Sequence, residues 1–294
     1  KGFKSSIAAL SIISLSVMST FVAMATSQND SDSSVLMKNV VESDTNILSI
    51  DGSVDLEEKI TLCDMKGTLY GIGVGPGDPR LMTYLAVDTI KRCPVIAVPA
   101  DGKGKAVAYK IASGIVEDLD AKECLNLSTP MTKDKAILDA AYQTAADTII
   151  EQLEQGKDVA CLTLGDPTIY STYIYIHRLV KAKGYETEIV NGIPSFCAVS
   201  AKLGDSLVDR SEQLHVIPST YDIEDGLKLP GTKVLMKAAS KMPIVKETLK
   251  RNDLKGAMIE NCGMPEEHIY HGVDEIPDQA SYYSIIVVKE DHHD

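Results

Sequence analysis

The chain has 294 residues, a formal net charge of −13 and a hydrophobic content of 44%. This length accommodates one large α/β domain or two smaller ones. The negative charge argues against a general nucleic-acid binder, because such proteins need a basic surface to meet phosphates. An anionic small molecule would have to be held by a few placed Lys or Arg side chains.

The N-terminal part differs from the rest of the chain. An apolar run over residues 7–22, preceded by lysines and followed by Ala23-Met24-Ala25, has the layout of a secretory signal peptide, so residues 1–25 are expected to resemble one. Residues 26–65 are polar and acidic with little periodicity, which predicts a disordered linker. Two interpretations stay open: a working export signal, or an extension upstream of a functional start near Met65.

From Thr68 onward, short β-branched runs alternate with longer runs of helical periodicity, which predicts a largely parallel α/β domain. Strands are expected at 68–74, 94–99, 124–127, 158–164 and 187–191, and helices at 79–90, 104–118, 132–155, 173–183 and 195–204. Asp78 is expected to cap the first of these helices, with Pro79 in its first turn.

After about Gly204 the pattern changes to strand-like runs with one clear helix at 243–251, which predicts a second domain richer in antiparallel strands. The expected organisation is an N-terminal α/β domain over 66–184, a C-terminal α/β domain over 185–290 and a tail over 291–294.

The six cysteines form no C-x-x-C pair, and His268 and His271 have no third ligand nearby in the sequence. We therefore expect no protein-bound metal, and buried free thiols in a reducing compartment.

The glycine-rich stretch GIGVGPGDP follows the first predicted strand. A dinucleotide-binding loop needs G-x-G-x-x-G, but the third glycine position holds Pro76 when counted from Gly71 and Asp78 when counted from Gly73. No G-K-[S/T] follows, so the Walker pattern also fails. A nicotinamide dehydrogenase and a P-loop enzyme are both disfavoured, and the glycines are interpreted as allowing a sharp turn or the close approach of a flat ligand.

Two more loops of this kind, LGDPTIYST at 164–172 and NGIPSF at 191–196, follow other predicted strands. In an open parallel sheet, ligands bind at the carboxyl ends of the strands. Three such loops at one edge predict a ligand site there.

These motifs, taken with IENCG and HGVDEI further along, resemble the tetrapyrrole methylases, which transfer a methyl group from S-adenosylmethionine. The resemblance covers residues 66–290, and the GDPTIYST and GIPSF forms are most similar to the branch that methylates C20 of precorrin-2 or cobalt-precorrin-2. It implies the two-domain fold of the class III methyltransferases with a cofactor cleft between the domains, and a homodimer. It implies neither a nucleic-acid partner nor a membrane partner for the folded part.

Carried over by motif, the resemblance also implies the residues that contact the cofactor. They are Pro76, Leu164, Gly165, Asp166, Ile169, Pro194, Ser195, Met236 and Gly272.

Methyl transfer from a sulfonium to an electron-rich carbon needs alignment more than a strong nucleophile, which suits a site built from Gly, Pro and Asp loops without a Ser-His-Asp set. Asp78 and Asp101 are weak candidates for a general base, and the catalytic residue is otherwise left open. Because the substrate carries many carboxylates, basic residues near the loops are candidate partners, together with Tyr170. The basic residues are Arg80, Lys103, Lys105, Lys237 and Lys241.

Two alternatives stay open. One is another reaction of the family, at C11, at C17, or at C2 and C7 of uroporphyrinogen III, with diphthine synthase more remote. The other is a non-catalytic, exported tetrapyrrole-binding protein, suggested by the N-terminal pattern. We expect the catalytic part to be cytoplasmic, because S-adenosylmethionine is supplied there.

Overall fold

The computed structural model describes residues 66–100, 106–130, 132–219 and 223–290. The chain divides into two units, Lys1–Asp64 and Met65–Asp294, and all the described residues lie in the second. The predictions for 1–25, 26–65 and the tail, and those for residues 101–105, lie outside the described residues.

The first sheet is parallel throughout and has the strand order β3-β2-β4-β1-β5. Its strands are β1 (Leu69–Gly73), β2 (Val95–Ala100), β3 (Glu123–Ser128), β4 (Val159–Thr163) and β5 (Thr187–Val190). Every residue of β1 and of the neighbouring β4 is buried. This is why both strands are almost continuously apolar in sequence: a parallel strand covered on both faces has no solvent side.

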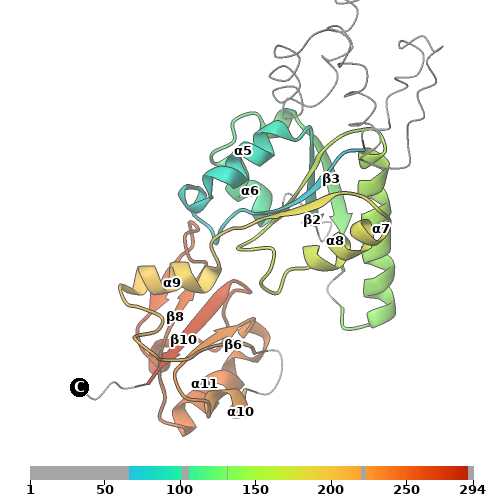
Figure 1. Cartoon of the computed structure of the whole chain (residues 1–294). Helices are drawn as coiled ribbons and strands as arrows, with labels where there is room; N and C mark the ends of the chain where they lie inside the picture. Colours follow the sequence, from blue (N-terminus) through green and yellow to red (C-terminus); the bar gives the residue numbers. More distant parts are fainter. Residues whose placement is uncertain (1–65, 101–105, 131, 220–222, 291–294) are drawn as a thin grey trace, which may run out of the picture. The chain divides into compact units, whose positions relative to one another are not determined.

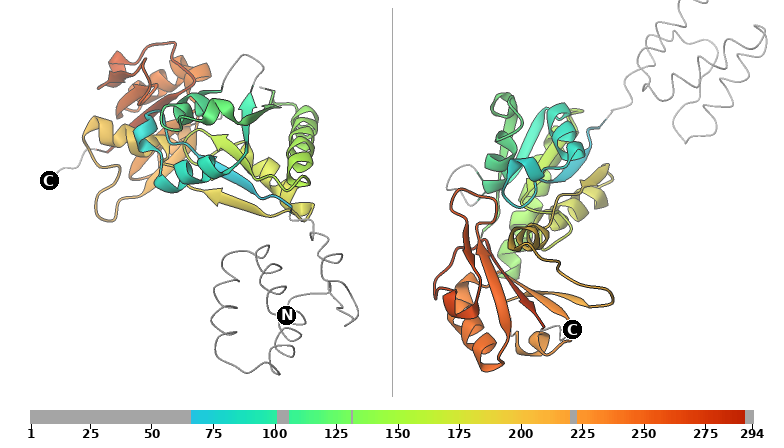
Figure 2. Two further views of the ribbon diagram at one scale, coloured as in Figure 1. Left: turned by 90° about the horizontal axis from the view of Figure 1, so that it is seen from above. Right: turned by 90° about the vertical axis from the view of Figure 1, so that its left-hand side faces the viewer.

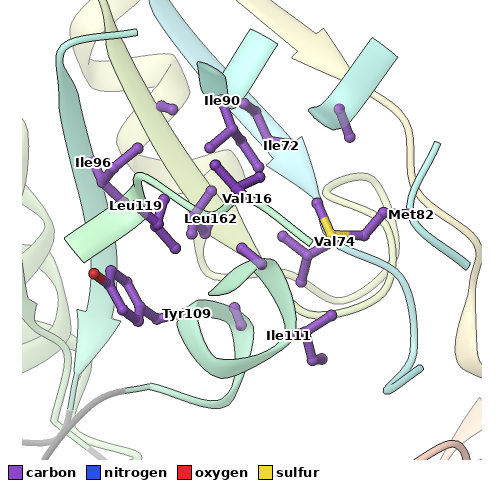
Figure 3. Packing of buried hydrophobic residues seen from close by; sticks show 14 of the residues in the cluster. Ile72, Val74, Met82, Ile90, Ile96, Tyr109, Ile111, Val116, Leu119 and Leu162 are labelled. Carbon is purple, nitrogen blue, oxygen red and sulfur yellow. The ribbon is translucent and has the colours of Figure 1, made fainter. Parts of the chain in front are cut away.

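Two layers of helices cover this sheet (Figure 1). On one face lie α5 (Tyr84–Arg92) and α6 (Val107–Ser113), and on the other α7 (Lys135–Leu153) and α8 (Tyr173–Ala182). Figure 3 shows the first of these interfaces, where Ile72 and Leu162 of the central strands pack with Ile90 of α5. The predicted alternation of strands and helices is therefore confirmed.

The start of α5 differs from the prediction. Asp78 caps a short 3-10 turn, η1 (Pro79–Leu81), and Met82 is extended, so the helix begins afresh after Thr83. The Thr83 hydroxyl accepts a hydrogen bond from the Ala86 amide, which satisfies one of the free N–H groups of the helix start. The helix expected at 104–118 is also shorter, because the chain leaves α6 at Gly114 and continues through η2 (Leu119–Ala121).

The second sheet is mixed and has the order β6-β7-β10-β8-β9. Its strands are β6 (Leu214–Pro218), β7 (Thr232–Met236), β8 (Lys255–Glu260), β9 (His268–Tyr270) and β10 (Ser284–Lys289). The β6–β7 pair is parallel and the other pairs are antiparallel, so this sheet is richer in antiparallel pairs than the first. The sequence pattern missed β9, because three residues are too few to show a period.

Helices cover both faces of the second sheet (Figure 2). On one side lie α10 (Glu224–Leu227) and α11 (Met242–Arg251), and on the other α9 (Ser195–Leu203). Two further 3-10 turns are η3 (Ala239–Lys241) and η4 (Val273–Glu275). Because α9 follows directly on β5, it carries the chain from one sheet to the other.

The strand β5 bears on the expected boundary at residues 184 and 185. It pairs with β1 in parallel, with Leu69 opposite Thr187, so it belongs to the first sheet. A boundary drawn from the sheets therefore falls after Val190. The hydrophobic pattern of the sequence could not place this boundary, because the strands of both sheets are apolar.

The five described cysteines are free. Cys93, Cys161 and Cys262 are buried, whereas Cys124 and Cys197 are exposed, so the expectation of burial is wrong for these two. Within the part of the chain that the structure describes, no helix is both long enough and apolar enough to cross a membrane.

Candidate functional site

Three loops at the carboxyl edge of the first sheet touch through glycines. A Cβ atom added to Gly192 would lie 2.1 Å from the carbonyl oxygen of Gly165, and one added to Gly73 would lie 2.5 Å from the Gly192 nitrogen. No side chain fits at such distances. Gly73, one of the glycines that first suggest a nucleotide loop, is therefore required by contacts between the loops themselves.

Backbone hydrogen bonds join two of these loops. The Gly75 amide donates to the Gly165 carbonyl at 3.2 Å, and the Gly165 amide donates to the Gly75 carbonyl at 2.8 Å. Both residues have positive φ angles, +77° and +70°, which glycine adopts without a steric penalty. The GPGDP loop and the GDPTIYST loop are thus held as one piece.

Asp166 joins the second loop to the third. One carboxylate oxygen accepts from the amide and the hydroxyl of Thr168, and the other accepts from the Asn191 side chain at 3.1 Å and the Gly192 amide at 3.0 Å. Burial acts to raise the pKa of this carboxyl, but the donors of Thr168, Asn191 and Gly192 outweigh it and the pKa is lowered. Both carboxylate oxygens already accept hydrogen bonds from the protein. Asp166 can therefore contact a bound molecule mainly through its backbone.

The first loop also contacts the loop after β8. A Cβ added to Gly77 would lie 2.3 Å from the Cys262 carbonyl, and one added to Gly263, whose φ is +76°, would lie 2.7 Å from the Asp78 nitrogen. The Glu267 carboxylate holds the loop after β8 in place by accepting hydrogen bonds from the Gly263 amide at 2.6 Å and from the Lys202 ammonium at 2.8 Å. The IENCG motif therefore lies against the GPGDP motif.

These loops border a cleft with a volume of about 650 Å³. Ten of the candidate site residues line it, from the loops after β1, β4, β5 and β7. They are Pro76, Leu164, Gly165, Asp166, Ile169, Tyr170, Pro194, Ser195, Met236 and Lys237. The structure thus brings together residues that are far apart in sequence.

Four of the described candidates do not line the cleft: Gly272, Asp78, Arg80 and Lys241, the last residue of η3. Gly272 precedes η4, and a Cβ there would have no neighbour within 4 Å. Asp78 pairs with Arg80 at 2.5 Å, and hydrogen bonds from the Arg80 side chain and backbone lower the pKa of Asp78 to about 2. Such a carboxylate is a weak base near neutral pH, which argues against Asp78 as a general base. Asp101, Lys103 and Lys105 lie outside the described residues.

The cleft is also lined by residues that the sequence motifs did not reveal. Tyr282 and Tyr283, just before β10, contribute aromatic rings packed edge to face, with centroids 5.4 Å apart. Three hydroxyl-bearing residues at the first sheet, Thr129, Thr163 and Ser171, also line the cleft. No sequence motif marks these residues, and the two adjacent tyrosines of the SYYS run are the available signal.

Tyr170 and Lys237 have unusual backbones. Their φ angles are +48° and +59°, in the left-handed region that residues with a Cβ seldom occupy. The Tyr170 hydroxyl donates to the Val216 carbonyl at 3.0 Å, so the residue both packs against the second sheet and lines the cleft. Strained residues of this kind cluster at binding and catalytic sites.

Among the described residues, no group of three or more His, Cys, Asp or Glu side chains is arranged to hold a metal ion. His268 lies on β9, and His271 follows that strand.

The architecture and the cleft match a known family. Residues 68–275 match the family model of tetrapyrrole (corrin/porphyrin) methylases. The chain is 35% identical, over 75% of its own length and 95% of the relative's, to a probable cobalt-precorrin-2 C(20)-methyltransferase of Methanocaldococcus jannaschii. It is 29% identical, over 76% of its length and 95% of the relative's, to a precorrin-2 C(20)-methyltransferase of Sinorhizobium sp..

Solved structures show the same fold. The uroporphyrin-III C-methyltransferase of Thermus thermophilus, in complex with S-adenosylhomocysteine, superposes with a TM-score of 0.56 at 18% identity, over 76% of this chain and 98% of that one. The fold is the class III methyltransferase fold expected from the sequence. The chain belongs to the tetrapyrrole methylases.

We predict that Gly192→Ala disrupts the contact of the three loops. The added methyl would lie 2.1 Å from the Gly165 carbonyl, and overpacking of this kind costs about 1–3 kcal/mol or more. Denaturant unfolding should show the loss, with Gly256→Ala as the control, because a Cβ at Gly256 has no neighbour closer than 3.4 Å. Equal stability of the two variants would contradict the prediction.

We also predict that Asp166→Asn destabilises the protein by about 1–3 kcal/mol, because an amide NH₂ would face donors already present. A lowered pKa means that the carboxylate contributes stability above its ordinary pKa of 3.8, and that this contribution is lost as the pH falls through the lowered value. The difference from the native protein should therefore shrink in acid. Denaturant unfolding is measured near neutral pH and in acid. Asp139→Asn, at an exposed ion pair with Lys135, is the control under both conditions.

Proposed function

We propose that this protein transfers the methyl group of S-adenosylmethionine to C20 of precorrin-2 or cobalt-precorrin-2, which yields the corresponding precorrin-3A in cobalamin biosynthesis. The observation that carries the proposal is the agreement between the cleft and the relatives. Residues of four motif loops line one cleft, and the relatives that match along nearly their whole length carry C20-methyltransferase names.

The lining suits S-adenosylmethionine. Ile169, Pro194 and Met236 offer apolar surface for a flat base, while Ser195 and the backbone of Gly165 offer polar groups. The backbone approaches the cleft closely at Gly165, because no Cβ intervenes. When bound, the cofactor supplies an electrophilic methyl group on a sulfonium. We therefore propose that the cofactor contacts those motif residues that line the cleft, which are Pro76, Leu164, Gly165, Asp166, Ile169, Pro194, Ser195 and Met236. Gly272, which does not line the cleft, is a more distant candidate.

The protein's contribution is mainly orientation. Holding two reactants in line can supply about 7–11 kcal/mol of a barrier, without any covalent role for a side chain. The glycine contacts and the Asp166 carboxylate make the loop edge rigid, so that groups bound there keep their relative position. The apolar lining excludes water from the methyl group. Which group accepts the proton of the methylated carbon stays open.

The reaction is testable directly. Purified protein, incubated with precorrin-2 or its cobalt form and with S-adenosylmethionine carrying a 13C-labelled methyl group, should give a product labelled at C20 by NMR. Added S-adenosylhomocysteine should suppress the label, as a control for specific transfer. A methyl group at C11, at C17 or at C2 and C7 would replace this proposal by another reaction of the family.

We propose further that the catalytic part works in the cytoplasm, where the methyl donor is made. Cell fractionation with an antibody to the folded part should find it there, in a form able to methylate. A mature species cut after Ala25 and found outside the cytoplasm would contradict this and favour the exported, non-catalytic binding protein. The homodimer that the family implies stays a prediction.

A further inference from the structure

Two charged side chains are found among the described residues that line the cleft, Asp166 and Lys237. They differ in how their charges are satisfied. Each oxygen of Asp166 accepts hydrogen bonds from two donors of the protein. A carboxylate satisfied in this way has little capacity left for a ligand. Of these two described residues, Lys237 is therefore the one whose charge remains available to a bound molecule.

Lys237 has no acidic partner in the described part of the chain. Its ammonium donates to the Tyr170 carbonyl at 3.4 Å and lies 5.6 Å from the centre of the Tyr170 ring. Other lysines at the second sheet are paired differently: Lys233 with Glu290 at 2.9 Å, and Lys289 with Asp205 at 2.7 Å. Burial lowers the pKa of the Lys237 ammonium.

The backbone holds this lysine at the cleft. Lys237 directly follows β7 and adopts a left-handed conformation that a glycine would adopt without strain. Its neighbour Tyr170 is left-handed as well, and the Tyr170 hydroxyl is tied to Val216 of β6. Tyr170 therefore positions the ammonium from a fixed point, with both its carbonyl and its ring.

We propose that Lys237 is the carboxylate anchor of the cleft. An ammonium has three donors, and the long contact with Tyr170 uses one of them, so two remain for an anion. A partly desolvated cation without a counter-charge favours a carboxylate more strongly than an exposed lysine does, because water competes less. The inference rests on the proposed function for its two possible ligands: an acidic side chain of the tetrapyrrole, or the amino-acid carboxylate of the methyl donor.

The test uses Lys237→Gln, which removes the charge and keeps the Cβ and its backbone strain, and Lys237→Arg, which keeps the charge. Lys91→Gln, at an exposed position on α5, is the matched control. The kcat is measured together with three constants: the KM for precorrin-2, the Kd of S-adenosylhomocysteine by calorimetry, and the Kd of uroporphyrin, an octacarboxylate, by fluorescence. Circular dichroism establishes that each variant is folded.

Loss of a charge-assisted hydrogen bond typically weakens binding by about 10- to 100-fold, and we expect this for Lys237→Gln but not for Lys91→Gln. Lys237→Arg should recover much of the loss. A change in the KM and in uroporphyrin binding assigns the carboxylate to the tetrapyrrole. A change in S-adenosylhomocysteine binding assigns it to the methyl donor.

The proposal is overturned if folded Lys237→Gln keeps all three constants. It is also overturned if kcat alone falls, because that result would indicate a role in proton transfer. If the native protein does not methylate precorrin-2, the proposed function fails instead. The two binding measurements still decide whether Lys237 holds a carboxylate.

Discussion

The close approach of three backbones at Gly73, Gly165 and Gly192 is the constraint on which the rest of the site depends. Parallel strands that lie side by side deliver their following loops to one edge, but ordinary side chains would hold those loops apart. Where a Cβ would lie 2.1 to 2.5 Å from a backbone atom of another loop, only hydrogen fits. The loops can therefore hydrogen-bond to one another and form a continuous rim.

Hydrogen bonds to a side chain also hold the loops together, in addition to the backbone contacts that the glycines permit. The Asp166 carboxylate is nearly buried, which would be costly for a charge without partners. Donors from its own loop and from the loop after β5 compensate for this cost, so the carboxylate acts as a fastener between them. The cleft then has a rigid side at the first sheet and a side at the second sheet that carries Lys237 and the tyrosines.

This arrangement fits the chemistry of methyl transfer. An in-line displacement is sensitive to small errors of alignment, and rigid loops limit such errors. A cleft whose described lining holds one unpaired ammonium, the hydrogen-bonded Asp166 carboxylate, and otherwise mainly hydroxyl, aromatic and apolar groups combines orientation with selection for an acidic ligand. It also explains how a protein of net charge −13 can serve an anionic substrate, since the local charge at the site differs from the global one.

The sequence predicted much of the fold for identifiable reasons. The buried strands β1 and β4 are continuous apolar runs, and a helix such as α5 repeats its apolar residues at the helical period, so both were predictable. The three-residue β9 was not, and neither was the break between η1 and α5, because an extended Met82 leaves no mark on the hydrophobic pattern. The assignment of β5 depended on its pairing with β1, which is a property of distant residues.

For the site, the amino-acid sequence by itself determined the family, the motif loops and the exclusion of a nucleotide-binding loop, because glycine spacing is a local property. Only the tertiary structure decided what the residues in those loops do. Asp166 binds its own protein, Asp78 is paired with Arg80 away from the cleft, and Lys237 faces the cleft without an acidic partner in the described chain. The physical reason is that the properties of a charged group depend on its neighbours in space, and those neighbours come from strands and loops far apart in the chain.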